Sequence, residues 1–201
     1  MEEPKRSRIL TVEQIDAVRR HCRPDRWPFI WTLLQTGARQ GEVLNLHVDD
    51  LSNSGGLVVF RSQPGSKSRG KERYTTVSPE LASCLATLGM VNGGRIFPFA
   101  RTTVREWWKE ICEAAAIRGV TLHGLRATFI TMGLDSGLPG SQVQRVVGHS
   151  SLAMTERYYR DIGQSLVVGE KIRSALGLGN RAGTPSNSPS THEVAQNLEN
   201  V

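Results

Sequence analysis

Apolar residues recur at helical spacing along most of the chain. The clearest series falls at i, i+3, i+4, i+7, i+8 and i+11 and consists of Val104, Trp107, Trp108, Ile111, Cys112 and Ala115. This spacing predicts one apolar helix face, so we interpret both tryptophans as core residues rather than as platforms for stacked bases.

Capping residues and helix breakers indicate where the other helices begin and end. Thr11 and Gln14 form a capping-box pattern that opens a helix reaching about Cys22. Pro28 begins an apolar helix that should stop at Gly37, because glycine readily adopts the left-handed conformation that ends helices. Further helices are predicted around 42–46, from the Ser78 cap to before Gly93, over 123–135, from a Ser141 cap to Gly148, over 152–159 and, more weakly, over 166–176.

Two short runs, 57–61 and 72–77, are typical of strands and flank a turn rich in Gly, Ser and Lys, so we expect a β-hairpin. From position 177 onward Gly, Ser, Asn and Pro dominate without an apolar pattern, which predicts a disordered tail over 177–201. The expected fold class is therefore mainly α with one small antiparallel β-sheet (α+β). One domain should cover 11–176 after a linker at 1–10.

Composition narrows the classes of partner and compartment. The 201 residues carry a formal net charge of +6, which favours a polyanionic partner such as nucleic acid. The 3 cysteines are odd in number and far apart, which argues against a disulfide framework and a zinc site and for a reducing interior. No apolar run reaches membrane-spanning length and no signal-peptide core is present, so we expect a cytoplasmic location and no membrane partner.

Residues suited to metal-free phosphoryl transfer follow one another in a fixed order: Arg39, His123, Arg126, His149 and Tyr158. Two guanidiniums can grip the oxygens of one phosphodiester, and two imidazoles can move protons near neutral pH. A phenol can act as the covalent nucleophile. Because the tyrosine lies nine residues after the second histidine, a turn and two helical turns would bring both into one pocket.

Taken singly, these residues also fit plainer interpretations. His123 and Arg126 share a helix face, as pairs on solvated helices commonly do, and His149 after a helix-ending glycine fits a loop residue. Arg39 lies at the opening of a helix, where backbone N–H groups favour an anion. Glu42 either orients the Arg39 guanidinium or forms a surface ion pair.

Two adjacent tyrosines compete for the role of nucleophile. Tyr158 and Tyr159 cannot point the same way from one helix, and periodicity alone does not choose between them.

The densest basic run lies in the hairpin turn and contains Lys67, Arg69, Lys71 and Arg73. It is either a solubilising turn or a flexible arm that carries a lysine to DNA, with Arg69, Lys71 and Arg73 as the expected DNA-binding residues. Such an arm could contact a base edge or a phosphate, or donate a proton to a leaving oxygen.

Three blocks, 36–46, 123–128 and 138–158, resemble in order and spacing the catalytic domain of the tyrosine recombinases, the phage-integrase family. The lysine hairpin falls between the first two blocks, as in that family, and the resemblance covers about 10–176. It implies the tyrosine-recombinase catalytic-domain fold and site-specific cleavage and rejoining of double-stranded DNA.

The resemblance also implies roles at the phosphate. Arg39 and Arg126 would clamp the non-bridging oxygens and stabilise the pentavalent transition state. Tyr158, at the family's spacing, would attack phosphorus and form a 3′-phosphotyrosyl link.

The remaining roles concern protons. Lys67 would protonate the departing 5′ oxygen, His123 would serve as general acid and base, and His149 would hydrogen-bond the phosphate. Bond energy is kept in the phosphotyrosine, so the resemblance implies neither a metal nor a nucleotide cofactor.

The sequence departs from the family pattern at three points. Gly124 stands where many members carry an acidic residue, and the long turn leaves Lys71 as a competitor of Lys67. We also expect no core-binding domain before position 11, which favours a catalytic fragment over a minimal enzyme. The helix at 166–176 would dock on a neighbouring protomer or on its own subunit, and other protomers should form a tetramer on DNA.

Three other functions compete with recombination. A type IB topoisomerase would use similar chemistry to relax supercoils, and a catalytically inactive DNA-binding regulator would bind without cleaving. A small-molecule phosphohydrolase would need a phosphate loop or metal ligands that the sequence does not display.

Overall fold

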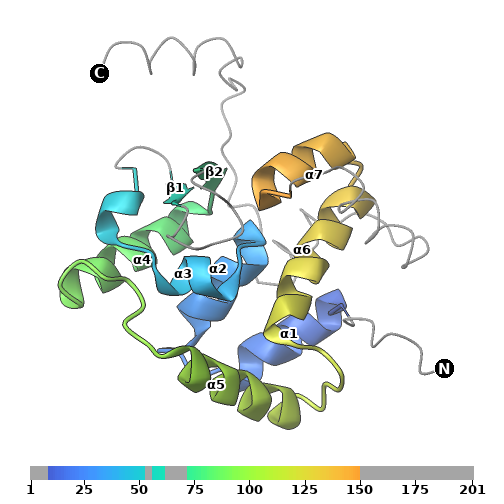
Figure 1. Ribbon diagram of the computed structural model, residues 1–201. Coiled ribbons are helices and arrows are strands. Elements are labelled where there is room, and N and C mark those ends of the chain that lie inside the picture. The colour runs from blue at the N-terminus through green and yellow to red at the C-terminus, as the bar shows by residue number, and fades with distance from the viewer. Residues whose placement is uncertain (1–8, 53–55, 62–71, 150–201) are drawn as a thin grey trace, which may run out of the picture.

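The computed structural model describes residues 9–52, 56–61 and 72–149 (Figure 1). Several predictions concern other positions and lie outside the described residues: those on Lys67, Arg69, Lys71, Tyr158 and Tyr159, on the linker, on the helices at 152–159 and 166–176, and on the tail.

Helices dominate the described part of the chain. In order, its elements are α1 (Val12–His21), α2 (Trp27–Thr36), α3 (Gln40–Leu44), the 3-10 helix η1 (Val48–Asp50), β1 (Leu57–Phe60), β2 (Arg73–Thr76), α4 (Pro79–Val91), α5 (Arg101–Ala114), α6 (Leu122–Asp135) and α7 (Gly140–Val147). The strands pair antiparallel, with Leu57 opposite Thr76 and Phe60 opposite Arg73. The predicted class, mainly α with a small antiparallel sheet, is confirmed.

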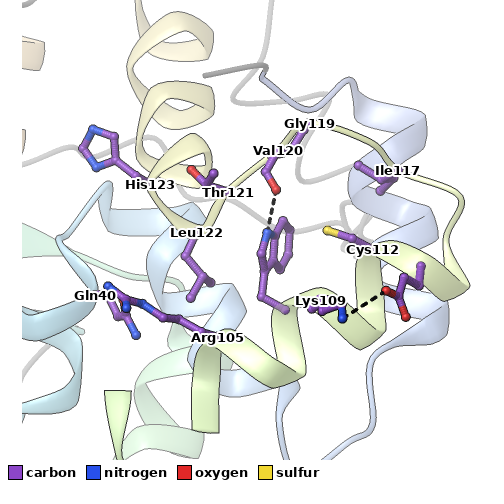
Figure 2. Close-up of a pocket in the computed structure, with 12 residues that line it drawn as sticks. Gln40, Arg105, Lys109, Cys112, Ile117, Gly119, Val120, Thr121, Leu122 and His123 are labelled. Carbon is purple, nitrogen blue, oxygen red and sulfur yellow. Dashed lines mark hydrogen bonds and ion pairs between the residues drawn. The ribbon is translucent and has the colours of Figure 1, made fainter. Parts of the chain in front are cut away.

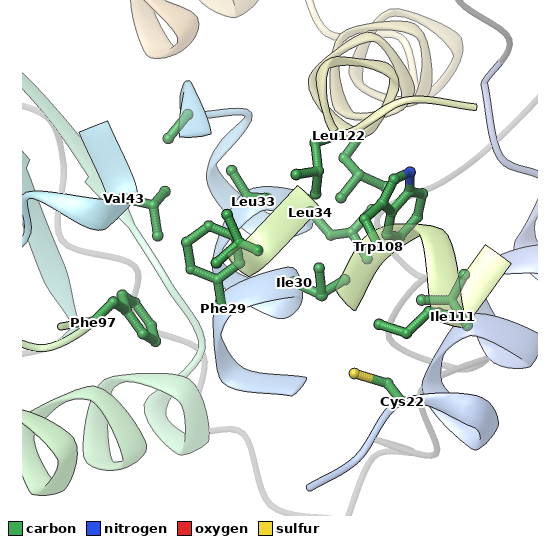
Figure 3. Packing of buried hydrophobic residues seen from close by; sticks show 14 of the residues in the cluster. Cys22, Phe29, Ile30, Leu33, Leu34, Val43, Phe97, Trp108, Ile111 and Leu122 are labelled. Carbon is green, nitrogen blue, oxygen red and sulfur yellow. The ribbon is translucent and has the colours of Figure 1, made fainter. Parts of the chain in front are cut away.

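The apolar helix α2 lies at the centre of the main core. Its Phe29 and Leu33 are at most 1% exposed, and Phe29 meets Phe97 edge-on with ring centroids 5.3 Å apart (Figure 3). Helices α6, α4, α3 and the α5 stripe surround it. A second, smaller cluster joins α6 to α7 through Ile130, Val143 and Val147.

The periodic stripe of α5 faces this core, as predicted. Trp108 is 5% exposed, and its indole N–H donates to the Val120 carbonyl at 2.9 Å. Trp107 is partly buried against the same cluster and lies edge-on to Phe99. Trp108 is therefore a core residue, and Trp107 packs at the edge of the core.

Capping predictions succeeded at two helices and failed at a third. Ser78 caps α4, where its hydroxyl oxygen accepts from the Leu81 N–H at 3.3 Å. Thr11 and Gln14 form the reciprocal capping box of α1, with backbone-to-side-chain bonds of 3.0 and 3.2 Å. The Ser141 cap is wrong, because α7 begins at Gly140 with Pro139 in the N-cap position and without a side-chain cap. Instead, the Pro139 carbonyl accepts from the N–H groups of Gln142 and Val143 and organises the first turn.

Helix α2 ends where its glycine predicted. Gly37 is the C-cap, with φ of 58°, and a Cβ on it would lie 2.4 Å from Cδ1 of Phe129 and 3.0 Å from a Val147 methyl. This position therefore requires glycine both for its backbone conformation and for the close approach of α6 and α7.

We expect Gly37→Ala to lower the free energy of unfolding by about 3 kcal/mol, the sum of left-handed backbone strain and overpacking. Gly93→Ala is the matched control, since Gly93 has φ of 67° but nothing within 4 Å of its built Cβ, and it should lose only about 1 kcal/mol. Urea unfolding of both variants measures the difference. Equal losses of unfolding free energy in the two variants would mean that the Phe129 side chain moves aside without an energetic cost.

Candidate functional site

The site is built on the guanidinium of Arg126, which is only 2% exposed. Its Nη1 donates to the carbonyl of Gly37 and its Nη2 to the carbonyl of Val147, both at 2.6 Å. These carbonyls lie at the C-terminal ends of α2 and α7, where the helix dipole favours a cation. Arg126 thus joins α6 to the ends of two other helices, and its interpretation as a surface residue is wrong.

Arg39 stands at the start of α3 and is oriented by Glu42. Its Nη1 donates to one carboxylate oxygen at 2.9 Å and its backbone N–H to the other at 2.8 Å. The Glu42 side chain is 16% exposed, so this is a part-buried orienting contact rather than a surface pair. The anion favoured at the opening of this helix is therefore the chain's own carboxylate.

Glu42 stays ionised in spite of its environment. Burial alone would raise the pKa of its carboxyl, but the charges of Arg73 and Arg39 and their hydrogen bonds outweigh burial and hold the pKa below its usual value.

Arg73, which we expected to bind DNA with the rest of the basic run, is buried rather than exposed. It is 9% exposed, donates from Nη2 to Glu42 and from Nη1 to the Val146 carbonyl, each at 2.7 Å, and lies 4.2 Å from the ring centroid of Phe60. The reason is strand alternation: Arg73 and Thr75 point inward, whereas Tyr74 points outward and is 56% exposed. The basic run, as an exposed feature, does not extend to Arg73.

The two histidines come from two helices, His149 from the end of α7 and His123 from the start of α6. His149 follows Gly148, the left-handed C-cap of α7, and is 8% exposed. Its backbone N–H donates to the Gln144 carbonyl at 3.1 Å, and its own carbonyl accepts from the Gln144 amide at 3.2 Å. His123 lies in the first turn of α6, after the Thr121 cap.

Both imidazoles have lowered pKa values. Burial, followed by the charges of Arg126 and Arg39, lowers the pKa of His123. The same causes in the same order, followed by the charge of His123, lower the pKa of His149 to about 4. The structure thus brings these four predicted residues together, and both histidines are neutral at neutral pH.

A pocket of about 580 Å³ opens beside His123, between α5 and the loop that leads into α6 (Figure 2). Ile117, Val120 and Leu122 contribute apolar walls, and Gln40 and Arg105 contribute polar groups. Among the described residues, no group of three His, Cys, Asp or Glu side chains is placed to hold a metal ion. None of the described helices is long and apolar enough to cross a membrane.

Sequence reasoning missed the place of Arg73 in this site and left that of Glu42 open. The signal for Arg73 was present: it is in phase with Thr75 and Val77, and all three are buried. The basic residues before it in the chain masked that alternation.

The chain matches a known protein family. Residues 8–164 match the model of the phage integrase family. Tyrosine recombinase XerA of Thermococcus kodakarensis is 29% identical over 151 residues, which are 71% of this chain and 51% of that protein. Tyrosine recombinase XerC of Staphylococcus carnosus is 31% identical over 147 residues, 67% of this chain and 48% of that protein. The chain spans about half the length of these relatives.

Solved structures share the fold at lower identity. The crystal structure of XerA recombinase superposes with a TM-score of 0.65 and 21% identity, covering 91% of this chain and 68% of that one. The catalytic domain of bacteriophage HP1 integrase gives 0.64 and 23%, covering 89% of this chain and all (100%) of that domain. The integrase of transposon Tn1549, in complex with transposon right end DNA, gives 0.61 and 18%, covering 89% and 67%. The expected tyrosine-recombinase catalytic-domain fold is thereby confirmed.

The depressed pKa of His149 predicts a loss of stability in acid. Because its pKa is about 4 when folded and near 6.5 when unfolded, the unfolded chain binds more protons between these values. The contribution of His149 is therefore complete above pH 6.5 and declines as the pH falls toward 4. Between pH 7.5 and pH 5 the wild type should lose about 2 kcal/mol more than His149→Gln in urea unfolding.

His21→Gln is the matched control, since His21 is exposed at the end of α1, away from the site. It should follow the wild type. An identical pH dependence in His149→Gln would show that His149 is not held neutral by its surroundings.

Proposed function

Because the chain belongs to the phage integrase family, we propose that it is the catalytic part of a site-specific recombinase that cleaves and rejoins double-stranded DNA through Tyr158. The observation that carries the proposal is the convergence of two arginines and two neutral histidines on one site. The net charge of +6 suits a polyanionic substrate. The Tn1549 relative, whose structure contains its DNA, supports the same class of substrate.

The arginines would bind the scissile phosphate. Arg126 donates to the carbonyls of Gly37 and Val147, which fix the plane of the guanidinium before DNA arrives. Glu42 fixes Arg39 in the same way. Preorganised cations lose little in reorganisation when negative charge develops on the equatorial phosphate oxygens, so they favour the transition state.

The proton transfers follow from the protonation states. Neutral His123 accepts the hydroxyl proton of Tyr158 as the phenolic oxygen forms its bond to phosphorus. The bond from phosphorus to the 5′ oxygen breaks, and Lys67 supplies the proton that this oxygen needs. Neutral His149 has one N–H to donate to the phosphate.

Rejoining reverses these steps, with a 5′ hydroxyl attacking the 3′-phosphotyrosyl link. The bond energy stays in the intermediate, so neither a metal nor a nucleotide is required. Exchange between two DNA sites requires four cleaved strands, which makes a tetramer of protomers on paired sites the proposed assembly.

A nicked suicide substrate tests the nucleophile. Incubated with a half-site from the flanks of its source element, the wild type should form a covalent adduct that peptide mass spectrometry maps to Tyr158. Tyr158→Phe should abolish the adduct, because it lacks the attacking oxygen, and Tyr159→Phe is the matched control that should retain it. EDTA should change neither result.

The other functions predict different outcomes of this assay. A half-site that is bound but never cleaved, with Tyr158→Phe identical to wild type, would indicate a DNA-binding regulator. Relaxation of plasmids without any sequence requirement would indicate a type IB topoisomerase.

A second assay distinguishes Lys67 from Lys71 as the general acid. Lys67→Ala should slow cleavage of normal DNA by about 10²-fold or more, because the 5′ oxygen leaves unprotonated. A substrate with sulfur at the bridging 5′ position should restore the rate, since a thiolate leaves without a proton. Lys71→Ala is the control and should show neither effect. If the sulfur substrate restored the rate of Lys71→Ala and not that of Lys67→Ala, Lys71 would be the general acid.

A further inference from the structure

The buried guanidinium of Arg73 contacts three elements that are far apart in sequence. It pairs with Glu42 of α3, donates to the Val146 carbonyl at the end of α7, and lies against the Phe60 ring of β1. Arg73 also begins β2, and Lys67 and Lys71 precede it by a few positions in the sequence. Arg73 therefore contacts the elements α3 and α7, which carry the candidate catalytic groups or lead into them.

A guanidinium is a costly way to fill this space. Burial removes it from water, and its Nε has no hydrogen-bond partner among the described residues. An apolar side chain of similar length would pack against Phe60 without that cost. What only arginine provides is a rigid fork that reaches two acceptors on two different elements, because a lysine ammonium is a single point charge.

Arg73 adds a second hydrogen bond, or tie, to the end of α7. Together with Arg126 it restricts the movement of α7 more than Arg126 can alone. Arg126 holds Val147 to Gly37, and Arg73 holds the adjacent carbonyl to Glu42. A single tie leaves the end of a helix free to pivot, whereas two ties on successive carbonyls fix its orientation. Gly148 packs directly on this arrangement, since a Cβ there would lie 3.0 Å from Cδ of Arg73. His149 is the next residue.

We propose that Arg73 is a positioning residue, whose fork between Glu42 and Val146 holds His149 in register with Arg39. The inference rests on the proposed function, because DNA cleavage is the reaction for which these groups are aligned. Arg73 acts through the residues that it holds and does not itself touch DNA.

Arg73→Met tests the proposal with Arg61→Met as the matched control. Arg61 lies next to Phe60 on the same hairpin and pairs with Asp50 and Glu72, so its substitution removes one cation without touching α7. Both variants should bind half-site DNA within about 3-fold of each other, since each loses one positive charge. Covalent adduct formation by Arg73→Met should be about 10²-fold slower than by Arg61→Met, the scale expected for an ångström of misalignment.

Titration of His149 by NMR, without DNA, provides a readout that is independent of activity. Because Arg73→Met also removes a cation that packs against Gly148, next to His149, the charge-preserving Arg73→Lys separates a change of position from the lost charge. In Arg73→Met the pKa of His149 should rise from about 4 toward its ordinary value as the end of α7 loosens. Arg61→Met should leave it unchanged.

Arg73→Lys keeps the proposal testable if the methionine variant does not fold. Lysine preserves the charge but reaches only one acceptor, so cleavage should remain impaired and the His149 pKa should still rise. Full activity and an unchanged His149 titration in the folded variants would overturn the proposal. If the wild type forms no adduct at all, the proposed function fails, whereas the His149 titration still decides whether Arg73 positions α7.

Discussion

The fold depends on one buried interaction, the guanidinium of Arg126 between the ends of α2 and α7. A cation is favoured at a helix C-terminus, and here one cation serves two termini. The same contact defines the site, because Gly37 leads within two residues to Arg39 and Val147 leads within two to His149. Loss of this guanidinium would leave two buried carbonyls unpaired and separate the candidate catalytic groups.

The guanidiniums of Arg39, Arg73 and Arg126 would repel one another at this site without a negative charge between them. Glu42 supplies that charge, since its two oxygens accept from Arg39 and Arg73. Burial, followed by the charges of Arg126 and Arg39, lowers the pKa of both histidines and keeps them neutral. The result is a positively charged site with two neutral imidazoles, each of which has one N–H to donate in a hydrogen bond and one ring nitrogen that can accept one.

The predictions differ in whether they depend on local sequence signals or on tertiary contacts. The capping box at Thr11, the stop at Gly37 and the stripe around Trp108 depend on residues a few positions apart, and the sequence predicted them. Ser141 failed as a cap because Pro139, two residues earlier, started the helix first. Arg73 failed as an exposed residue because its neighbours in sequence are basic, whereas its neighbours in space are Phe60, Glu42 and Val146.

The sequence by itself determined the class of fold and the family, and it proposed the candidate catalytic residues, because periodicity, caps and ordered motifs are properties of the chain. Only the tertiary structure decided which side chains hold the others in place. Arg126 meets Gly37 across 89 positions and Arg73 meets Val146 across 73. Contacts over such separations depend on how whole helices pack. No local sequence pattern predicts that packing. The packing decides whether a charged residue is exposed, so that it can contact a ligand, or buried, so that it holds the site together.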